Sequence, residues 1–306
     1  MRKCFVLVLL CIGMLWLQTP LAGQIFEENF DYPAGDALTD HGWIEIRSGT
    51  PFTISSPGLT YPNYPLSGIG NAVSMVTGNE KEVKNVFPAQ TSDSIYISFL
   101  MNISDATTRN DGVFFYLGPT DIDIYKREIT VYVRKDTLDN LAFGISKGDG
   151  TGYTNFLYPM NMTHLLVIKY KFNPGVDDDE LSLWVNPCTS APETTPDRMD
   201  PTGTDVTELA EIVLSQLTAS NTAPTALIDG IRITTSWFET LRGDPTCDGN
   251  VNVLDILAIA NHIIGLAPLD EHLMDIADCN GDGKVNVLDM VGIANVIISV
   301  FTECPG

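Results

Sequence analysis

A twelve-residue pattern rich in Asp, Asn and Gly occurs twice near the end of the chain, 34 residues apart. The first copy runs from Asp244 to Asp255 and the second from Asp278 to Asp289. Each copy has oxygen-bearing side chains at positions 1, 3, 5, 9 and 12, and a glycine at position 6, where the chain must turn sharply. This spacing can surround a hard cation with carboxylate, amide and carbonyl oxygens, which are the ligands that Ca²⁺ prefers. The pattern therefore predicts two calcium-binding loops.

The two copies differ at position 3, which is Thr246 in the first and Asn280 in the second. A threonine hydroxyl is the weaker ligand, so we expect the second loop to bind calcium more tightly. Position 7 contributes its backbone carbonyl, which leaves its side chain free to vary. The predicted ligands are Asp244, Thr246, Asp248, Asn250 (carbonyl), Asn252 and Asp255 in the first loop, and Asp278, Asn280, Asp282, Lys284 (carbonyl), Asn286 and Asp289 in the second.

An apolar helix is expected after each loop. Large apolar residues recur there at i, i+3 and i+7, a spacing that places them on one helical face. Position 12 is Asp rather than the Glu of ordinary EF-hands, and no full helix is expected before either loop. The helical face is predicted to consist of Ile256, Ile259 and Ile263 after the first loop, and of Met290, Ile293 and Ile297 after the second.

This duplicated loop–helix arrangement resembles a type I dockerin, the module that docks secreted proteins onto cohesins. The resemblance covers Gly243–Val300, and we expect the module to occupy residues 243–306. It implies two calcium ions, a cohesin partner and a partner surface that is identical in the two repeats, which offers the partner two orientations related by a half-turn. Core packing is an alternative reason for that identity. The implied surface residues are Val253, Leu254, Ala260, Asn261, Val287, Leu288, Ala294 and Asn295.

Residues 24–238 have a different pattern, in which short runs of β-branched and aromatic residues are separated by Gly, Pro, Asn and Asp. In several runs apolar residues alternate, as Ile95, Ile97 and Phe99 do, which is typical of antiparallel sheets with a buried face. About ten such runs favour two packed sheets over a helical fold. The clearest expected strands are Ser94–Ile103, Gly112–Leu117, Glu128–Arg134, Leu141–Ser146, His164–Phe172, Glu180–Val185, Glu208–Leu217 and Ala226–Thr234.

Three segments of this region, Phe26–Tyr32, Leu183–Pro187 and Ile228–Trp237, resemble secreted laminin-G-like, concanavalin A-like jelly rolls. The resemblance implies a mainly β fold, a two-sheet jelly-roll sandwich over residues 24–238 followed by the small all-α dockerin. We interpret Pro187–Asp205 as a long loop within the sandwich rather than as a linker. Such jelly rolls include carbohydrate binders, glycoside hydrolases and domains of unknown role, so the resemblance does not choose a reaction.

No catalytic residue is predicted in the sandwich, because no E-x-D-x-x-E run occurs in it. The dense acidic groups, Glu27–Glu28 and Asp177–Glu180, are expected to be solvated or to bind calcium. Two aromatic loops are candidates for sugar stacking, Tyr61–Pro65 and the one that carries Tyr153, Phe156 and Tyr158. The alternative is that these aromatic side chains cover the edge of the core.

The first 23 residues have the features of a secretory signal. Arg2 and Lys3 precede an apolar run from Cys4 to Leu17, which is shorter than the roughly 20 residues that a bilayer span needs. We therefore expect an exported protein without a membrane span. The net charge of −22 disfavours binding to nucleic acid or to anionic membrane surfaces.

Four cysteines, Cys188, Cys247, Cys279 and Cys304, follow the signal segment, and outside the cell they allow three full disulfide pairings. One bridge with two free thiols is the alternative. The ends of a dockerin lie close together, so the resemblance implies a Cys247–Cys304 bridge, which would leave Cys188 to pair with Cys279.

These features favour a secreted, non-catalytic protein that presents a jelly roll, with polysaccharide as a possible ligand, on a cohesin-bearing scaffold in polysaccharide degradation. A dockerin-borne glycoside hydrolase or lyase acting on plant polysaccharide is the second interpretation. A third makes the helical module an intramolecular stabiliser without a partner, and it would be favoured by helices that pack on the sandwich.

Overall fold

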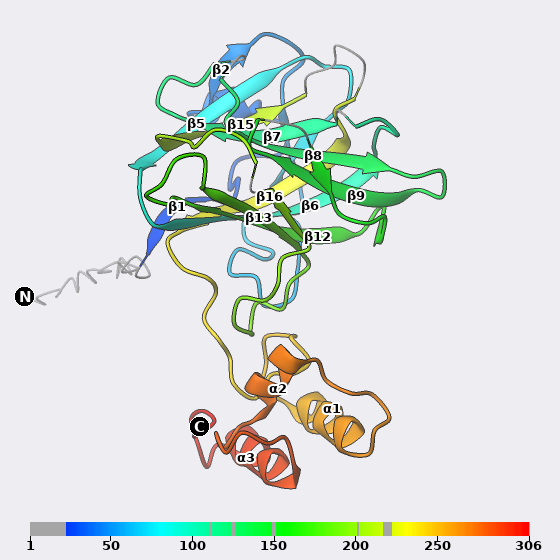
Figure 1. Cartoon of the computed structure of the whole chain (residues 1–306). Coiled ribbons are helices and arrows are strands. Elements are labelled where there is room, and N and C mark those ends of the chain that lie inside the picture. Colours follow the sequence, from blue (N-terminus) through cyan, green and yellow to red (C-terminus); the bar gives the residue numbers. More distant parts are fainter. Residues whose placement is uncertain are drawn as a thin grey trace, which may run out of the picture.

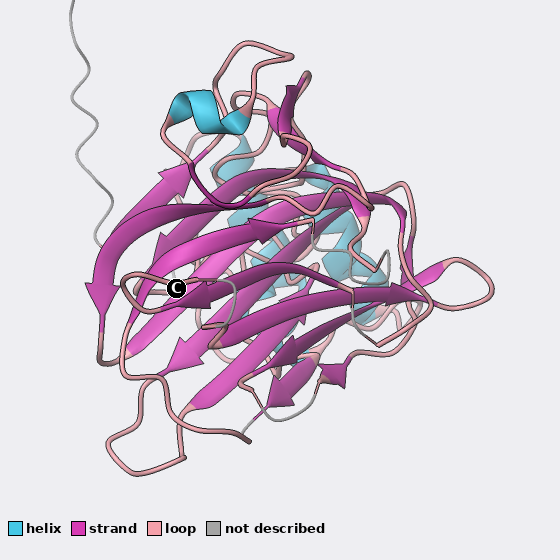
Figure 2. Cartoon of the chain, turned by 90° about the horizontal axis from the view of Figure 1, so that it is seen from above, coloured by secondary structure: helices cyan, strands magenta, loops and turns pink. Residues whose placement is uncertain are grey.

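The computed structural model describes residues 23–110, 112–123, 126–148, 151–200, 202–216 and 222–305. They form a sandwich of two antiparallel sheets, with three α-helices at the C-terminal end (Figure 1). The fold is mainly β, as predicted. Seen from above, the sandwich strands lie in front of these helices (Figure 2). The expected signal segment lies, apart from Gly23, outside the described residues.

The first sheet has the strand order β14-β13-β12-β6-β16-β4-β3, with β1 paired to β16. The long strand β6 lies between β12 and β16, so its backbone is hydrogen-bonded on both edges. The strands of this sheet are β1 (Gln24–Glu28), β3 (Thr53–Ser55), β4 (Ala72–Met75), β6 (Ser94–Asp105), β12 (Thr163–Lys171), β13 (Glu180–Val185), β14 (Arg198–Asp200) and β16 (Thr225–Thr234).

The second sheet has the order β10-β9-β8-β7-β15-β5-β2, with β11 paired to β9. A short 3-10 helix, Leu38–His41, precedes β2. The strands of this sheet are β2 (Ile44–Arg47), β5 (Glu82–Gln90), β7 (Val113–Gly118), β8 (Ile129–Lys135), β9 (Asn140–Ser146), β10 (Gly152–Tyr153), β11 (Tyr158–Pro159) and β15 (Leu209–Ser215).

The main core lies between the two sheets. The alternating residues Ile95, Ile97 and Phe99 of β6 are buried in it, as are Leu181 and Leu183 of β13. The outer face of the first sheet carries a second apolar cluster, in which side chains of β6, β12 and β13 are covered by the loop of residues 59–66. Burial on both faces explains why β6 reads as a nearly continuous apolar run rather than as a strict alternation.

The segment Pro187–Asp205 belongs to the sandwich, as predicted, because it contributes β14, which pairs with β13. The eight strands that the sequence predicts are all present, with boundaries shifted by no more than two residues. The additional strands β1, β2, β3, β4, β5, β10, β11 and β14 complete the two sheets.

The helical module has a small core of its own. Helices α1 (Val253–Ile263) and α3 (Val287–Ile297) follow the two predicted calcium loops, and the seven-residue α2 (Glu271–Ala277) precedes the second loop. Ile259 of α1 and Ile293 of α3 are fully buried in this core. In the part of the chain that the structure describes, no helix is long and apolar enough to cross a membrane.

The disulfide pairing differs from the one that we expected. Cys188 bonds to Cys247 and Cys279 bonds to Cys304, so the Cys247–Cys304 and Cys188–Cys279 prediction is wrong. The two ends of the module do meet, because Cys304 Sγ lies beside Gly243. Cys279, at position 2 of the second loop, faces the returning C-terminal tail, whereas Cys247, at position 4 of the first loop, faces the sandwich. One bridge therefore closes the helical module and the other joins it to the sandwich.

Candidate metal centre and docking surface

The position-1 carboxylate organises each twelve-residue loop. Asp244 accepts hydrogen bonds from the backbone N–H groups of positions 5 and 6, at 3.1 and 2.9 Å, and Asp278 accepts the same two bonds, at 3.1 and 2.7 Å. The position-6 glycines, Gly249 and Gly283, have φ values of +82° and +80°, which a residue with a side chain adopts only with strain. Each loop therefore wraps around its first carboxylate.

Positions 9 and 12 both face the loop and begin the following helix. Asn252 is the N-cap of α1, and its backbone N–H donates to Asp255 Oδ2 at 2.7 Å; Asn286 and Asp289 form the same capping box at α3, at 2.8 Å. Asp255 and Asp289 are fully buried. Burial raises the pKa of Asp255, although its hydrogen bonds partly oppose this effect. Closing the loop and starting the helix thus depend on the same side chains.

Position 3 differs between the loops in its contacts as well as in its chemistry. The Thr246 hydroxyl lies between the carboxylates of positions 1 and 12, 3.2 Å from Asp244 Oδ1 and 2.7 Å from Asp255 Oδ1. In both loops the position-3 backbone N–H donates to the position-12 carboxylate at 3.2 Å, and Asn280 has no hydroxyl to add to that bond. Its side-chain oxygen accepts from the position-5 N–H, at 2.9 Å.

The position-7 carbonyls point toward the loop interior. The Asn252 side-chain amide donates to the carbonyl of Asn250 at 3.2 Å, and that of Asn286 donates to the carbonyl of Lys284 at 3.3 Å. Each loop thus supplies three carboxylates, a backbone carbonyl and the neutral side-chain oxygen of position 3, whereas the position-9 side-chain oxygen accepts the N–H of position 11 and caps the helix. This mixed, flexible oxygen set fits Ca²⁺ better than Mg²⁺, which demands a tighter octahedral shell, or Zn²⁺, which prefers nitrogen and sulfur.

The predicted partner surface is exposed where each helix begins. Val253 and Leu254 are 67% and 52% exposed, and Val287 and Leu288 are 59% and 62% exposed. The helix residues of the prediction, Ala260, Asn261, Ala294 and Asn295, are half-buried. The backbone carbonyls of the two asparagines accept the N–H groups that end the helices. Val253, Leu254, Val287 and Leu288 therefore form an exposed apolar surface. Asn261 and Asn295 also help to end their helices, through their backbone carbonyls.

Further exposed apolar side chains extend this surface in both repeats. Leu257 and Val291 lie one helical turn beyond the first pair, and Ile263 and Ile297, the last residues of the two predicted helical faces, are also exposed. Two more pairs follow the helices. All of them occur at the 34-residue offset of the repeat, so the repeat itself is the sequence signal that identifies them. The additional pairs are Leu257 with Val291, Ile264 with Ile298, and Leu266 with Val300.

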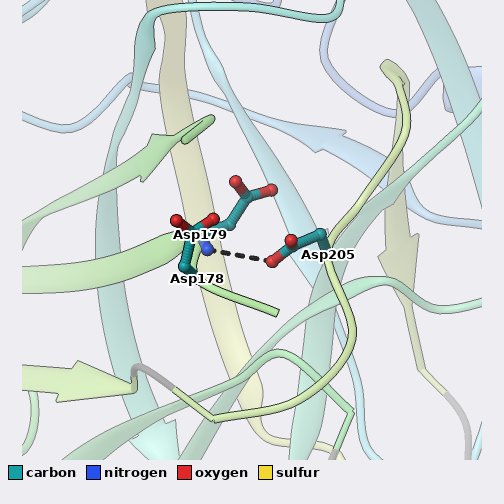
Figure 3. A group of neighbouring side chains, drawn as sticks. All are labelled: Asp178, Asp179 and Asp205. Atoms are coloured by element: carbon teal, nitrogen blue, oxygen red, sulfur yellow. Dashed lines mark hydrogen bonds between the residues drawn. The ribbon is translucent and has the colours of Figure 1, made fainter. Parts of the chain in front are cut away.

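In the acidic group Asp177–Glu180 of the sandwich, Asp177 and Asp178 are exposed, as expected of solvated carboxylates, whereas Asp179 is buried in a hydrogen-bond network. Asp178, Asp179 and Asp205 bring three carboxylates within 4.8 Å of one another (Figure 3). The fully buried ammonium of Lys147 donates to the Asp179 carbonyl at 2.7 Å and lies 3.2 Å from Asp205 Oδ1. The Tyr170 hydroxyl donates to the Asp179 carboxylate. The ammonium group of Lys147 thus provides the positive charge that a bound calcium ion would otherwise bring to these carboxylates.

Glu28 also departs from the expectation of a solvated or calcium-binding role. It is 8% exposed, and its carboxylate accepts hydrogen bonds from the Phe30 N–H, the Tyr32 hydroxyl and the Trp43 indole. Its neighbour Glu27 pairs with Arg232. Glu28 therefore fixes the chain after β1.

Tyr64 and Tyr158 of the two aromatic loops cover the core, as the alternative interpretation held. Tyr64 is buried, and its hydroxyl donates to the Gly230 carbonyl, while Tyr158 packs against Phe143 of the main core. Tyr153 and Phe156 instead lie half-buried against the Arg134 guanidinium, whose carbon is 4.1 and 4.9 Å from the two ring centroids. Tyr61 differs, because it lines an open hollow of about 410 Å³ together with Thr60, Pro62, Asn63 and Ser67. Of the residues predicted to stack on sugars, Tyr61 is the one that the structure places in a hollow of the described surface.

The comparisons with known proteins separate the two parts of the chain. Residues 242–297 match the family described as the dockerin type I domain. No curated protein matches the chain in sequence.

Solved structures similar to this chain are distant. They include an endo-β-1,4-glucuronan lyase from the fungus Trichoderma reesei (10% identity, 70% of this chain and 96% of that chain, TM-score 0.44). Another is the alginate lyase Aly36B (9% identity, 72% and 100%, TM-score 0.41). A third is the lectin UEA-II complexed with galactose (15% identity, 69% and 98%, TM-score 0.38). Residues 242–297 of this chain are thus a dockerin type I domain, which follows a two-sheet β-sandwich.

Proposed function

We propose that this is an exported protein whose dockerin binds two calcium ions and attaches the sandwich to a cohesin-bearing partner. The observation that carries the proposal is the repeated apolar surface. Val253 and Leu254 in one repeat, and Val287 and Leu288 in the other, are exposed directly beside the two loops. Apolar side chains exposed in this way, over two equivalent sites, are typical of a protein interface.

Calcium, when bound, would neutralise the carboxylates that each loop gathers and so favour the folded loop. The residues that would hold it are those at positions 1, 3, 5, 7, 9 and 12 of each loop. Because positions 9 and 12 also cap α1 and α3, ion binding is coupled to the start of both helices and hence to the placement of the docking residues. The Thr246 hydroxyl supports weaker binding in the first loop than in the second.

The contacts between the two modules favour docking over a purely intramolecular role. The sandwich contacts the dockerin through the Cys188–Cys247 bridge and through the first calcium loop. The helices lie away from the sheets (Figure 1), and their apolar side chains remain exposed. A module that served only to stabilise the sandwich would be expected to bury that surface against it.

Binding of the full chain to a panel of immobilised type I cohesins, with calcium and with chelator, tests the proposal. Asp255→Ala together with Asp289→Ala should remove calcium-dependent binding, because each substitution deletes a calcium ligand and the N3 carboxylate of a capping box. Asp275→Ala with Glu303→Ala removes the same charge from exposed positions outside the loops and should bind normally. Undiminished binding by the Asp255/Asp289 variant, or binding that persists in chelator, would refute the proposal.

We further propose that the sandwich binds polysaccharide at the hollow beside Tyr61. Its half-buried ring offers an aromatic surface at the rim, and aromatic packing contributes about 0.5–1.5 kcal/mol beyond area burial. Tyr61→Ala should therefore weaken retention on a polysaccharide affinity gel by roughly two- to tenfold. Tyr132→Ala, on the other sheet, is the matched control and should have no effect. Release of sugar products by the chain would instead identify a dockerin-borne enzyme.

A further inference from the structure

The first calcium loop, unlike the second, is in direct contact with the sandwich. The Cys188–Cys247 bridge joins position 4 of the loop to the segment that follows β13. Gly249, at position 6, lies so close to Asn63 that an added Cβ would be 2.7 Å from the Asn63 Cβ. Figure 1 shows loops of the sandwich descending toward the helical module at this point. Position 6 of the first loop therefore contacts the sandwich, whereas position 6 of the second loop, Gly283, has no neighbouring atom within 4 Å of an added Cβ.

Ser190 lies at the centre of this contact. It is fully buried, and its hydroxyl oxygen accepts a hydrogen bond from the Asn63 side-chain amide at 2.6 Å. Because that bond uses an oxygen lone pair, the hydroxyl proton is available, and it is donated to Asp244 Oδ2 at 2.6 Å. The Ser190 backbone carbonyl is also held, by the Leu241 N–H at 2.8 Å. The sandwich thus presents an oriented donor to the position-1 carboxylate of the first loop.

The second loop has no equivalent of this donor. Among the described residues, the Asp278 carboxylate receives hydrogen bonds from backbone N–H groups of its own loop alone, at 2.7 and 3.1 Å. Asp244 receives the same two backbone bonds and has the Thr246 hydroxyl of its own loop 3.2 Å away; the bond from Ser190 is the one that comes from outside the loop. The repeats therefore differ in what surrounds the first ligand, although the ligand itself is the same.

We propose that Ser190 of the sandwich is a positioning residue for the first calcium site, so that this site is completed by the neighbouring module. The inference rests on calcium binding by the loops, as proposed above. A donor that holds one carboxylate oxygen fixes the direction of the remaining lone pairs, and such outer partners typically change metal affinity 10- to 100-fold. The Cys188–Cys247 bridge, two residues from Ser190, keeps the donor in place.

Each calcium site has its own reporter, which makes the test specific. The backbone N–H groups of Gly249 and Gly283 donate to the two position-1 carboxylates, so their amide resonances in ¹⁵N-resolved spectra follow the two sites separately during a calcium titration of the full chain. The test variant is Ser190→Ala. Thr189→Ala is the matched control, since it removes a neighbouring buried hydroxyl that contacts the Asn63 carbonyl and not Asp244.

In Ser190→Ala the Gly249 transition should move to about tenfold higher calcium or more, while the Gly283 transition stays where it is in the unmodified protein. Thr189→Ala should move neither transition. The inference is wrong if the Gly249 transition is unchanged in Ser190→Ala, or if both glycines shift together, which would indicate a general loss of folding. If neither glycine responds to calcium in the unmodified chain, the proposed calcium binding itself fails, and the role of Ser190 fails with it.

Discussion

At the scale of single residues, the carboxylates of this acidic chain have several distinct structural roles. Those of the calcium loops accept backbone N–H groups and begin helices, whereas Asp179 and Glu28 hold strands and turns of the sandwich together. Asp229 in β16 is fully buried and accepts the N–H groups of Leu59 and Gly230, both at 2.6 Å. Burial raises the pKa of Asp229 from 3.8 to about 7.

The raised pKa of Asp229 predicts a pH dependence of stability. Between about pH 4 and pH 7 the folded chain keeps a proton on this carboxyl that the unfolded chain has lost, so the contribution of Asp229 is present at low pH and is lost as the pH rises through 7. The unfolding free energy of the natural protein, relative to that of Asp229→Asn, should fall by up to roughly 1.4 kcal/mol per pH unit across this window. Urea unfolding followed by the sandwich tryptophans, in excess calcium, measures it. A difference that does not change with pH would contradict the prediction.

At the scale of elements, the sequence predicts best those strands that are long and buried. The eight predicted strands were recognisable because burial of one or both faces leaves an apolar run or an alternation in the sequence itself. Short strands such as β10 and β14 were missed, since two or three residues are too few to show a period and exist only through pairing with β9 and β13. The helix α2 has an aspartate, Asp270, at its N-cap position, but its seven residues are too few for a helical period to show in the sequence.

The symmetry of the two helices predicts how the docking surface responds to substitution. Val253→Asp and Val287→Asp each place a charge in one of two equivalent exposed surfaces, so a partner that uses either one should tolerate each single change with a loss below about tenfold. The double substitution should weaken cohesin binding by more than about a hundredfold, because either orientation then buries an unpaired charge, which costs several kcal/mol. Calcium titrations of the same variants check that the loops remain intact. A single substitution that alone abolishes binding would show that one orientation carries it.

At the scale of the whole molecule, the predictable part of the site is the part that is local in sequence. All predicted ligands of a loop lie within twelve residues, so their spacing alone indicates the ion. The outer partner of Asp244 lies 54 residues away, in a segment without any motif, and no rule of spacing points to Ser190. The cysteine pairing failed for the same reason, because the expectation treated the dockerin as closed on itself, whereas its first loop faces the sandwich.

The two disulfides should therefore have separable effects on the shape of the molecule. Replacing Cys188 and Cys247 by serine removes the covalent tie beside Ser190 and opens a 59-residue loop, which the chain-entropy model values at about 4 kcal/mol. We expect the distance distribution from small-angle X-ray scattering in excess calcium to broaden and its maximum to increase, as the dockerin moves relative to the sandwich. Replacing Cys279 and Cys304 opens only the 25-residue loop inside the dockerin and should leave the distribution unchanged while lowering the melting temperature of that module. Equal scattering from the Cys188/Cys247 variant and the natural protein would mean that the hydrogen bonds around Ser190 hold the two modules in place without the bridge.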